Sequence, residues 1–110
     1  MKIKAGKKEL LIKDRMVIRF EASGNLCKIF LENGRSMILE ESLDALEIQL
    51  ESSSFIRIHQ NHIINAEHIS SIPEKASTGI KLSNGVNIPV GDRRLVQLKE
   101  IIENHINPKT

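Results

Sequence analysis

The fold is decided by one stretch, FIRIHQNHIIN, at residues 55–65. Its first five residues alternate, with isoleucine at every second position, and a period of two places the two sets on opposite faces of a β-strand. Three polar residues follow, Gln60, Asn61 and His62, before Ile63 and Ile64 resume the apolar run. The pattern predicts strand, polar turn and strand, with amide and imidazole groups at the tip of a hairpin. A tip that is merely solvated is the simpler interpretation of these residues taken alone.

The composition of the 110 residues is that of one globular domain. Apolar residues make up 40% and aromatic residues only 3%, so aliphatic side chains must form the core and few rings remain for base stacking. The net charge is +2, from 16 basic and 14 acidic residues, which does not by itself indicate a nucleic-acid partner. Residues 1–20 are mainly basic and residues 40–51 acidic, so one side of the domain is expected to be basic and another acidic.

The single cysteine and the apolar runs bear on localisation. Cys27 has no partner for an intramolecular disulfide and is expected to be a small buried hydrophobe. The chain shows neither a signal peptide nor an apolar run of transmembrane length. A cytoplasmic protein without a membrane partner is therefore expected.

Short strands separated by turn signals are predicted along the rest of the chain. Apolar residues predict strands at 10–12, 16–22, 26–32, 37–39, 69–72, 80–82 and 86–90. Asn33-Gly34 and Asn84-Gly85 are hairpin signals, because both residue types tolerate positive φ. Pro89 favours an edge strand. The whole of 1–110 is expected to be one domain, in which 1–9 and 106–110 are loosely ordered ends.

Two helices are predicted, each from a cap candidate and an apolar stripe. Ser42 and Asp92 are the cap candidates. The stripes are Leu43, Leu46 and Leu50 in the first helix, and Leu95, Leu98 and Ile102 in the second, which should end near Asn104. The predicted fold class is mostly β, with about eight short, mainly antiparallel strands in small sheets and two short α-helices.

No motif makes an enzyme the leading hypothesis. His59 and His62 form H-x-x-H without the glutamate of H-E-x-x-H, so neither a metal nor another cofactor is expected. Three turns, at 23–25, 60–61 and 91–94, carry amide or guanidinium groups, which are the groups that read base edges in DNA. The composition leaves open whether these turns lie along one side of a sheet.

Along nearly its whole length the chain resembles the LytTR-type DNA-binding domains. The central match is Phe55-Ile56-Arg57-Ile58-His59 followed by Ile63-Ile64-Asn65, which fits the family's F-x-R-x-H core. Three further segments match in the same order as in the family: Glu21-Ala22 with Gly24-Asn25, Ser42-Leu43 at the first helix, and Asn84-Gly85 with Ile88-Pro89-Val90.

The resemblance implies sequence-specific binding of double-stranded DNA by loops inserted into successive grooves, in a bacterial transcriptional regulator. Domains of this family usually serve as output domains of response regulators. The resemblance also implies a homodimer on paired sites, and a receiver domain or regulatory partner outside this chain. The alternative is a protein-interaction module on the same fold that has lost specific DNA binding.

Carried over residue by residue, the resemblance places DNA contacts in three loops. Arg57 and Asn65 match motif positions that either touch DNA or orient the loop, and His59 is expected to brace it. The expected DNA-binding residues are Asn25, Lys28, Arg57, His59, Gln60, Asn61, Arg93 and Arg94. Three positions depart from residues common in the family, Leu26, Gln60 and Gly91-Asp92, so the base preference of these loops is left open.

Overall fold

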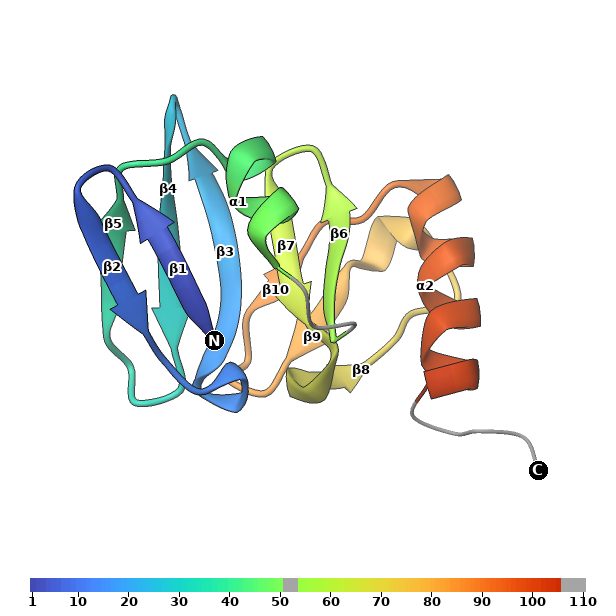
Figure 1. The fold of residues 1–110 in the computed structure, drawn as a ribbon. Helices are drawn as coiled ribbons and strands as arrows, with labels where there is room; N and C mark the ends of the chain where they lie inside the picture. Colours follow the sequence, from blue (N-terminus) through green and yellow to red (C-terminus); the bar gives the residue numbers. More distant parts are fainter. Residues whose placement is uncertain (51–53, 106–110) are drawn as a thin grey trace.

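A five-stranded antiparallel sheet occupies the middle of the molecule, and residues 55–65 form two of its strands (Figure 1). The computed structural model describes residues 1–50 and 54–105. The order in the sheet is β5-β4-β3-β7-β6. These strands are β3 (Val17–Ser23), β4 (Leu26–Leu31), β5 (Ser36–Leu39), β6 (Phe55–His59) and β7 (His62–Asn65). The predicted strand, turn and strand over 55–65 are thus confirmed.

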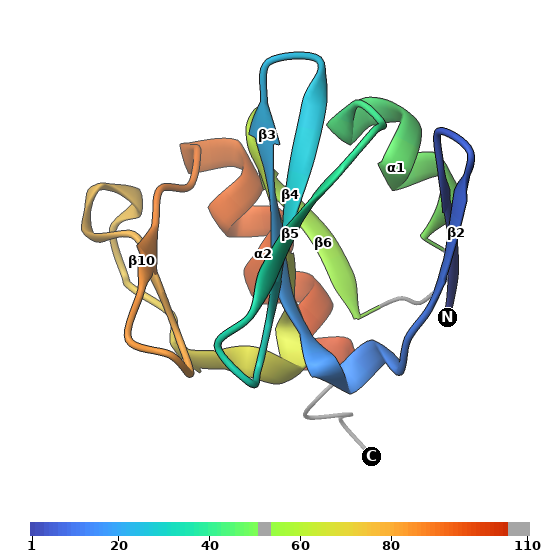
Figure 2. The same cartoon turned by 90° about the vertical axis from the view of Figure 1, so that its left-hand side faces the viewer.

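Smaller elements cover both faces of this sheet, as the edge-on view in Figure 2 shows. One side carries the hairpin of β1 (Lys2–Ala5) and β2 (Lys8–Leu11) and helix α1 (Leu43–Gln49). The other side carries a three-stranded sheet of β8 (Ile69–Ser71), β9 (Ile80–Leu82) and β10 (Asn87–Ile88), and helix α2 (Asp92–His105). Short 3-10 turns lie at Asp14–Met16, Ala66–His68 and Ala76–Thr78. The mostly β fold class is confirmed, with ten strands among the described residues instead of about eight.

The two sides of the sheet bury separate apolar cores, and β3 contributes to both. Val17 and Phe20 belong to the core under β1, β2 and α1, whereas Ile18 belongs to the core under β9, β10 and α2. A regular period of two over residues 16–22 would place Ile18 and Phe20 on the same face, but they lie on opposite sides of the sheet. A bulge in the pairing of β3 with β4, between Val17 and Arg19, changes the side to which the following residues point.

Residues 1–9 are part of a paired hairpin, which corrects the expectation of a loosely ordered end. Ile3 and Ala5 point into the first core, and Gln49 of α1 exchanges two hydrogen bonds of 2.8 Å with the backbone of Lys4. The alternation of exposed and buried residues over Lys2–Ala5 is the period of a half-buried strand. The abundance of lysine concealed that alternation. The other expected loose end, 106–110, lies outside the described residues.

The turns and caps follow the predicted chemistry, with two differences. Gly34 and Gly85 have positive φ, of 85° and 86°. Asn33 and Asn84 do not, since no non-glycine residue described has positive φ. These asparagines therefore stabilise the turns through their side chains and not through their backbone conformation. The Oδ1 atom of each accepts a hydrogen bond from the amide two residues later. Ser42 is the predicted N-cap of α1, since its hydroxyl accepts from the amide of Ala45 at 3.1 Å. Asp92 lies in the first turn of α2 and not before it.

Two further sequence expectations concern burial. Cys27 is fully buried in the first core, as predicted, and burial raises the pKa of its thiol to about 11. Pro89 directly follows β10, which is an edge strand of its sheet, again as predicted. None of the helices in the described residues has the length and apolar character needed to cross a membrane.

Candidate functional site

The three turns singled out in the sequence lie at the same end of the molecule, the upper end in Figure 1. They are the β3–β4 turn at Gly24 and Asn25, the β6–β7 turn at Gln60 and Asn61, and the start of α2. Strand pairing places the first two together, since the amide of Ala22 donates to the carbonyl of Asn61 at 2.9 Å. The amide of Gly91 lies 3.4 Å from the carbonyl of Ile58, which brings the start of α2 beside the end of β6.

A shallow hollow of about 230 Å³ lies between two of these turns. Asn25 of the first turn, and Gln60 and Asn61 of the second, line it together with Asp44 at the start of α1. All four residues are exposed, so their polar groups face solvent at this end. We call this end of the molecule, defined by Asn25, Gln60, Asn61 and Arg93, the tip face.

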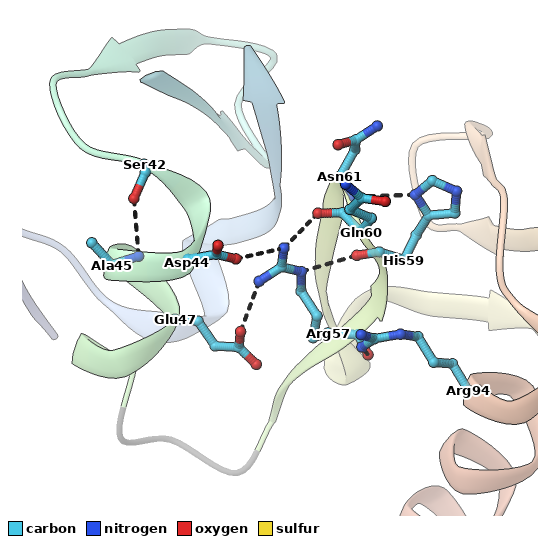
Figure 3. Close-up of polar contacts among 9 residues, drawn as sticks. All are labelled: Ser42, Asp44, Ala45, Glu47, Arg57, His59, Gln60, Asn61 and Arg94. Atoms are coloured by element: carbon cyan, nitrogen blue, oxygen red, sulfur yellow. Dashed lines mark hydrogen bonds and ion pairs between the residues drawn. The ribbon is translucent and has the colours of Figure 1, made fainter. Parts of the chain in front are cut away.

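The β6–β7 turn is held from its own strand, as Figure 3 shows. The Nδ1 atom of His59 accepts a hydrogen bond from the backbone amide of Asn61 at 3.1 Å. The Arg57 guanidinium donates to the carbonyls of His59, at 2.9 Å, and of Gln60. The backbone of the turn is therefore fixed, while the amide side chains of Gln60 and Asn61 have no hydrogen bonds to the described part of the chain.

Two carboxylates of α1 hold the other side of the Arg57 guanidinium. Its Nη1 atom lies 2.7 Å from Glu47 and its Nη2 atom 3.0 Å from Asp44. The Arg57 side chain is only 11% exposed, whereas Asp44 is 86% exposed. The sequence identified Arg57 but not its partners. The spacing of Asp44 and Glu47, three residues apart on a predicted helix, was the signal that placed both on one face.

The remaining predicted contact residues differ in how free their side chains are. Arg93 is exposed and makes no hydrogen bond or ion pair with the residues that the structure describes. Arg94 donates to the carbonyl of Arg57 at 2.9 Å, so it also fastens α2 to β6. Lys28 is half-buried on β4, with its Nζ atom 5.2 Å from the centre of the Phe30 ring. Within the described part of the chain, the tip face thus presents amides and the unpaired guanidinium of Arg93, whereas the guanidinium groups of Arg57 and Arg94 are engaged by backbone carbonyls.

Asn65, the last residue of the deciding stretch, lies away from the tip face and has a structural role. Its side chain is fully buried. The amide nitrogen donates to the carbonyls of Val17 at 2.9 Å and Asp14 at 3.1 Å, and the amide oxygen accepts from the backbone of Glu67 at 3.0 Å. Of the two roles left open for Asn65, these contacts favour the one that orients the backbone.

His62 lies behind the turn in a mixed environment. Its ring centre is 5.3 Å from that of His59, and its Nδ1 atom is 3.6 Å from the Glu21 carboxylate, without a hydrogen bond to the described residues. Burial lowers the pKa of His62 below its usual 6.5; the Glu21 charge opposes this shift, and His59 and Arg19 add to it. Among the described residues, no group of three or more His, Cys, Asp or Glu side chains is placed to hold a metal ion.

The lowered pKa of His62 implies a stability that depends on pH. The unfolded chain takes up a proton at this histidine at higher pH than the folded chain does. Above pH 6.5 both states hold His62 neutral, and this residue does not reduce the free energy of unfolding. As the pH falls below 6.5, proton uptake by the unfolded chain lowers the free energy of unfolding. Urea unfolding between about pH 5 and pH 8 should show a free energy of unfolding that decreases toward acid, with a smaller decrease for His62→Gln. Equal decreases for both proteins would contradict this assignment.

Comparison with known proteins gives one family and a small set of relatives. The model of the LytTR family, described as the LytTr DNA-binding domain, matches residues 7–103. Two curated relatives from Paraburkholderia xenovorans (strain LB400) are the heme-containing CO-sensing transcriptional regulators RcoM 2 and RcoM 1, which are 28% and 26% identical over 96 residues. These matches cover 84% of this chain, and the chain spans only 36% of each relative's length.

A solved structure with the same fold is the LytTr DNA-binding domain of a methyl-accepting/DNA response regulator from Bacillus cereus. The TM-score is 0.73 and the sequence identity 22%, and the match covers 93% of this chain and 94% of the other. The fold agrees along nearly the whole of both chains.

Proposed function

Because this chain belongs to the family of LytTr DNA-binding domains, we propose that it recognises a specific double-stranded DNA sequence through its tip face and so regulates transcription. The observation that carries the proposal is the meeting of three separate turns at one end of the molecule (Figure 1). Each turn presents an amide or guanidinium group to solvent, and these are the groups that form paired hydrogen bonds with base edges. Regulation of transcription is also what the names of the RcoM relatives state of those proteins.

The eight candidate residues take different roles in this proposal. Asn25, Gln60 and Asn61 read base edges, since their side chains are exposed and the β6–β7 backbone beneath the last two is fixed. Arg93 contacts phosphate or a guanine edge. Lys28 on β4 and Arg94 in the first turn of α2 add phosphate contacts. His59 and Arg57 orient the second turn, because their polar atoms are engaged by its backbone.

Paired sites fit this mode of binding. One domain of this size covers a short stretch of a duplex, and two copies bound about 10 base pairs apart would meet the same face of the DNA. We therefore propose that the chain acts as a homodimer on DNA. A receiver domain or another regulatory partner would supply the signal, in keeping with the small share of the RcoM relatives that this chain spans.

The test is a selection of bound fragments from a fragmented genomic library, followed by gel shifts of the enriched fragments with excess competitor DNA. We expect a small set of fragments with a shared, repeated element. The retained fragments should outcompete random duplexes by a factor of about 10³ or more. A protein that retains no fragment at low salt would overturn the proposal and leave the protein-interaction alternative.

The salt dependence of binding should be modest. Arg57 is neutralised by Asp44 and Glu47, so Lys28, Arg93 and Arg94 are the candidate cations that remain for phosphate contacts. Each phosphate contact contributes about 0.9 to the slope of log affinity against log salt, so three contacts give a slope of about 2 to 3 per domain. Fluorescence anisotropy over a salt series measures this slope. Affinity that is the same at low and moderate salt would argue against DNA as the ligand.

A further inference from the structure

The Arg57 guanidinium has a position and a set of partners that are unusual for a cation beside a DNA-binding surface. It lies directly behind Gln60, yet every one of its nitrogens has an acceptor within the chain. Two of these acceptors are carbonyls of the β6–β7 turn and two are carboxylates of α1 (Figure 3). The guanidinium therefore joins the turn to the helix, and its charge is balanced by two negative charges.

The two carboxylates lie on the solvent side of this arrangement. Asp44 is 86% exposed and Glu47 48% exposed, against 11% for the Arg57 side chain. Asp44 also lines the hollow that contains Asn25, Gln60 and Asn61. Because both carboxylates are exposed, solvent screens their attraction to Arg57 and limits what the ion pairs add to folding stability. Stability alone therefore does not account for acidic groups at a DNA-binding face, where they repel phosphate.

Without its carboxylates, Arg57 would be an unbalanced cation beside the tip face. A guanidinium binds phosphate with paired, charge-assisted hydrogen bonds whatever the sequence of the DNA. Such a contact would strengthen binding to any duplex. It would also withdraw the guanidinium from the carbonyls of His59 and Gln60, and so loosen the turn that carries the reading amides.

We propose that Asp44 and Glu47 set the preference of this domain for its cognate site over random DNA, by holding the Arg57 guanidinium on the β6–β7 turn and away from phosphate. The inference rests on the proposed function of sequence-specific DNA binding. It makes Arg57 a positioning residue for Gln60 and Asn61, and it makes the two carboxylates determinants of specificity that need not touch a base.

The test is the double variant Asp44→Asn/Glu47→Gln, compared with the wild type on the selected cognate duplex and on a random duplex. On random DNA we expect affinity about 5- to 10-fold tighter near 0.1 M salt, and a salt slope about 0.9 larger, as one added phosphate contact gives. On cognate DNA the gain should be smaller or absent. The ratio of cognate to random affinity should therefore fall several-fold, with little change in the thermal unfolding temperature.

Two controls separate this mechanism from a simple change of charge. The variant Glu100→Gln/Glu103→Gln removes the same charge from exposed positions near the far end of α2, and its affinity ratio should equal that of the wild type. In an Arg57→Gln background, replacing Asp44 and Glu47 should tighten cognate and random binding by the same factor, because no guanidinium remains to be released. The conservative Asp44→Glu keeps the ion pair and should keep the ratio.

The outcomes distinguish this inference from the function on which it rests. A wild-type protein that prefers no sequence overturns both. If the wild type has a cognate site and the double variant keeps the wild-type ratio, the inference is wrong and the proposed function stands. An equal fall in the ratio with and without Arg57 would also overturn it, since the effect would then not pass through the guanidinium.

Discussion

Asn65→Ala is expected to lower the free energy of unfolding by about 2 to 4 kcal/mol. The side chain is fully buried and makes three hydrogen bonds to backbone groups of Asp14, Val17 and Glu67. Alanine leaves the carbonyl of Val17 without this partner in the interior, and an unsatisfied buried polar group costs about 1 to 3 kcal/mol. The small cavity left by the amide adds to that cost. Urea unfolding followed by circular dichroism gives the difference directly.

Asn84→Ala is the matched control for this prediction. Asn84 is exposed in the β9–β10 turn, and its side chain accepts one hydrogen bond, from the amide of Val86 at 3.1 Å. Water replaces that bond in the variant, so the loss should be below about 1 kcal/mol. Equal losses for the two variants would contradict the prediction. They would show that the burial of Asn65 and its bonds to Val17 and Asp14 add no stability beyond that of an exposed turn asparagine.

The features of the fold that depend on residues close together in the chain could be predicted from the sequence. A period of two over residues 55–59 and the polar break at 60–61 are local signals, and the hairpin forms where they predict it. The same holds for the Ser42 cap and for the apolar stripe of α1. These features depend on neighbours within a few residues, and such neighbours are visible in the chain.

Features that depend on distant partners were missed or placed wrongly. β1 was not predicted because the alternation over Lys2–Ala5 is short and its stabilising contacts come from Gln49 and the first core. The two-sided burial of β3 depends on a bulge and on a second layer that only the tertiary structure supplies. In both cases a packing partner far along the chain decides the local structure.

The candidate site also has a part that local sequence predicts and a part that depends on distant partners. The exposed amides of Gln60 and Asn61 follow from a polar turn between apolar strands. The sequence left open whether Arg57 contacts phosphate or orients the loop, because the choice depends on Asp44 and Glu47, which lie 13 and 10 residues earlier in the chain. Their contacts with Arg57 now favour the orienting role, which the variants above test.

Mutation of the two exposed amides separates base reading from positioning on the tip face. Gln60→Ala and Asn61→Ala are each expected to cost about 1 to 3 kcal/mol on the cognate duplex, the size of a lost base contact. The turn beneath these side chains is already fixed by Arg57 and His59, so little backbone freedom is lost on binding and little of the amides' interaction energy is offset. Anisotropy titrations of both duplexes with each variant measure the effect.

Three comparisons make this result specific to base reading. On random DNA both amide variants should bind nearly as the wild type does, because phosphate contacts do not depend on these amides. Arg93→Ala should instead weaken both duplexes and lower the salt slope by about one, if it holds phosphate. Asn33→Ala removes an exposed turn amide at the opposite end of the molecule and should change neither. If the amide variants bind the cognate duplex like the wild type, the β6–β7 turn does not read sequence, and recognition must come from the turns at Asn25 and Arg93.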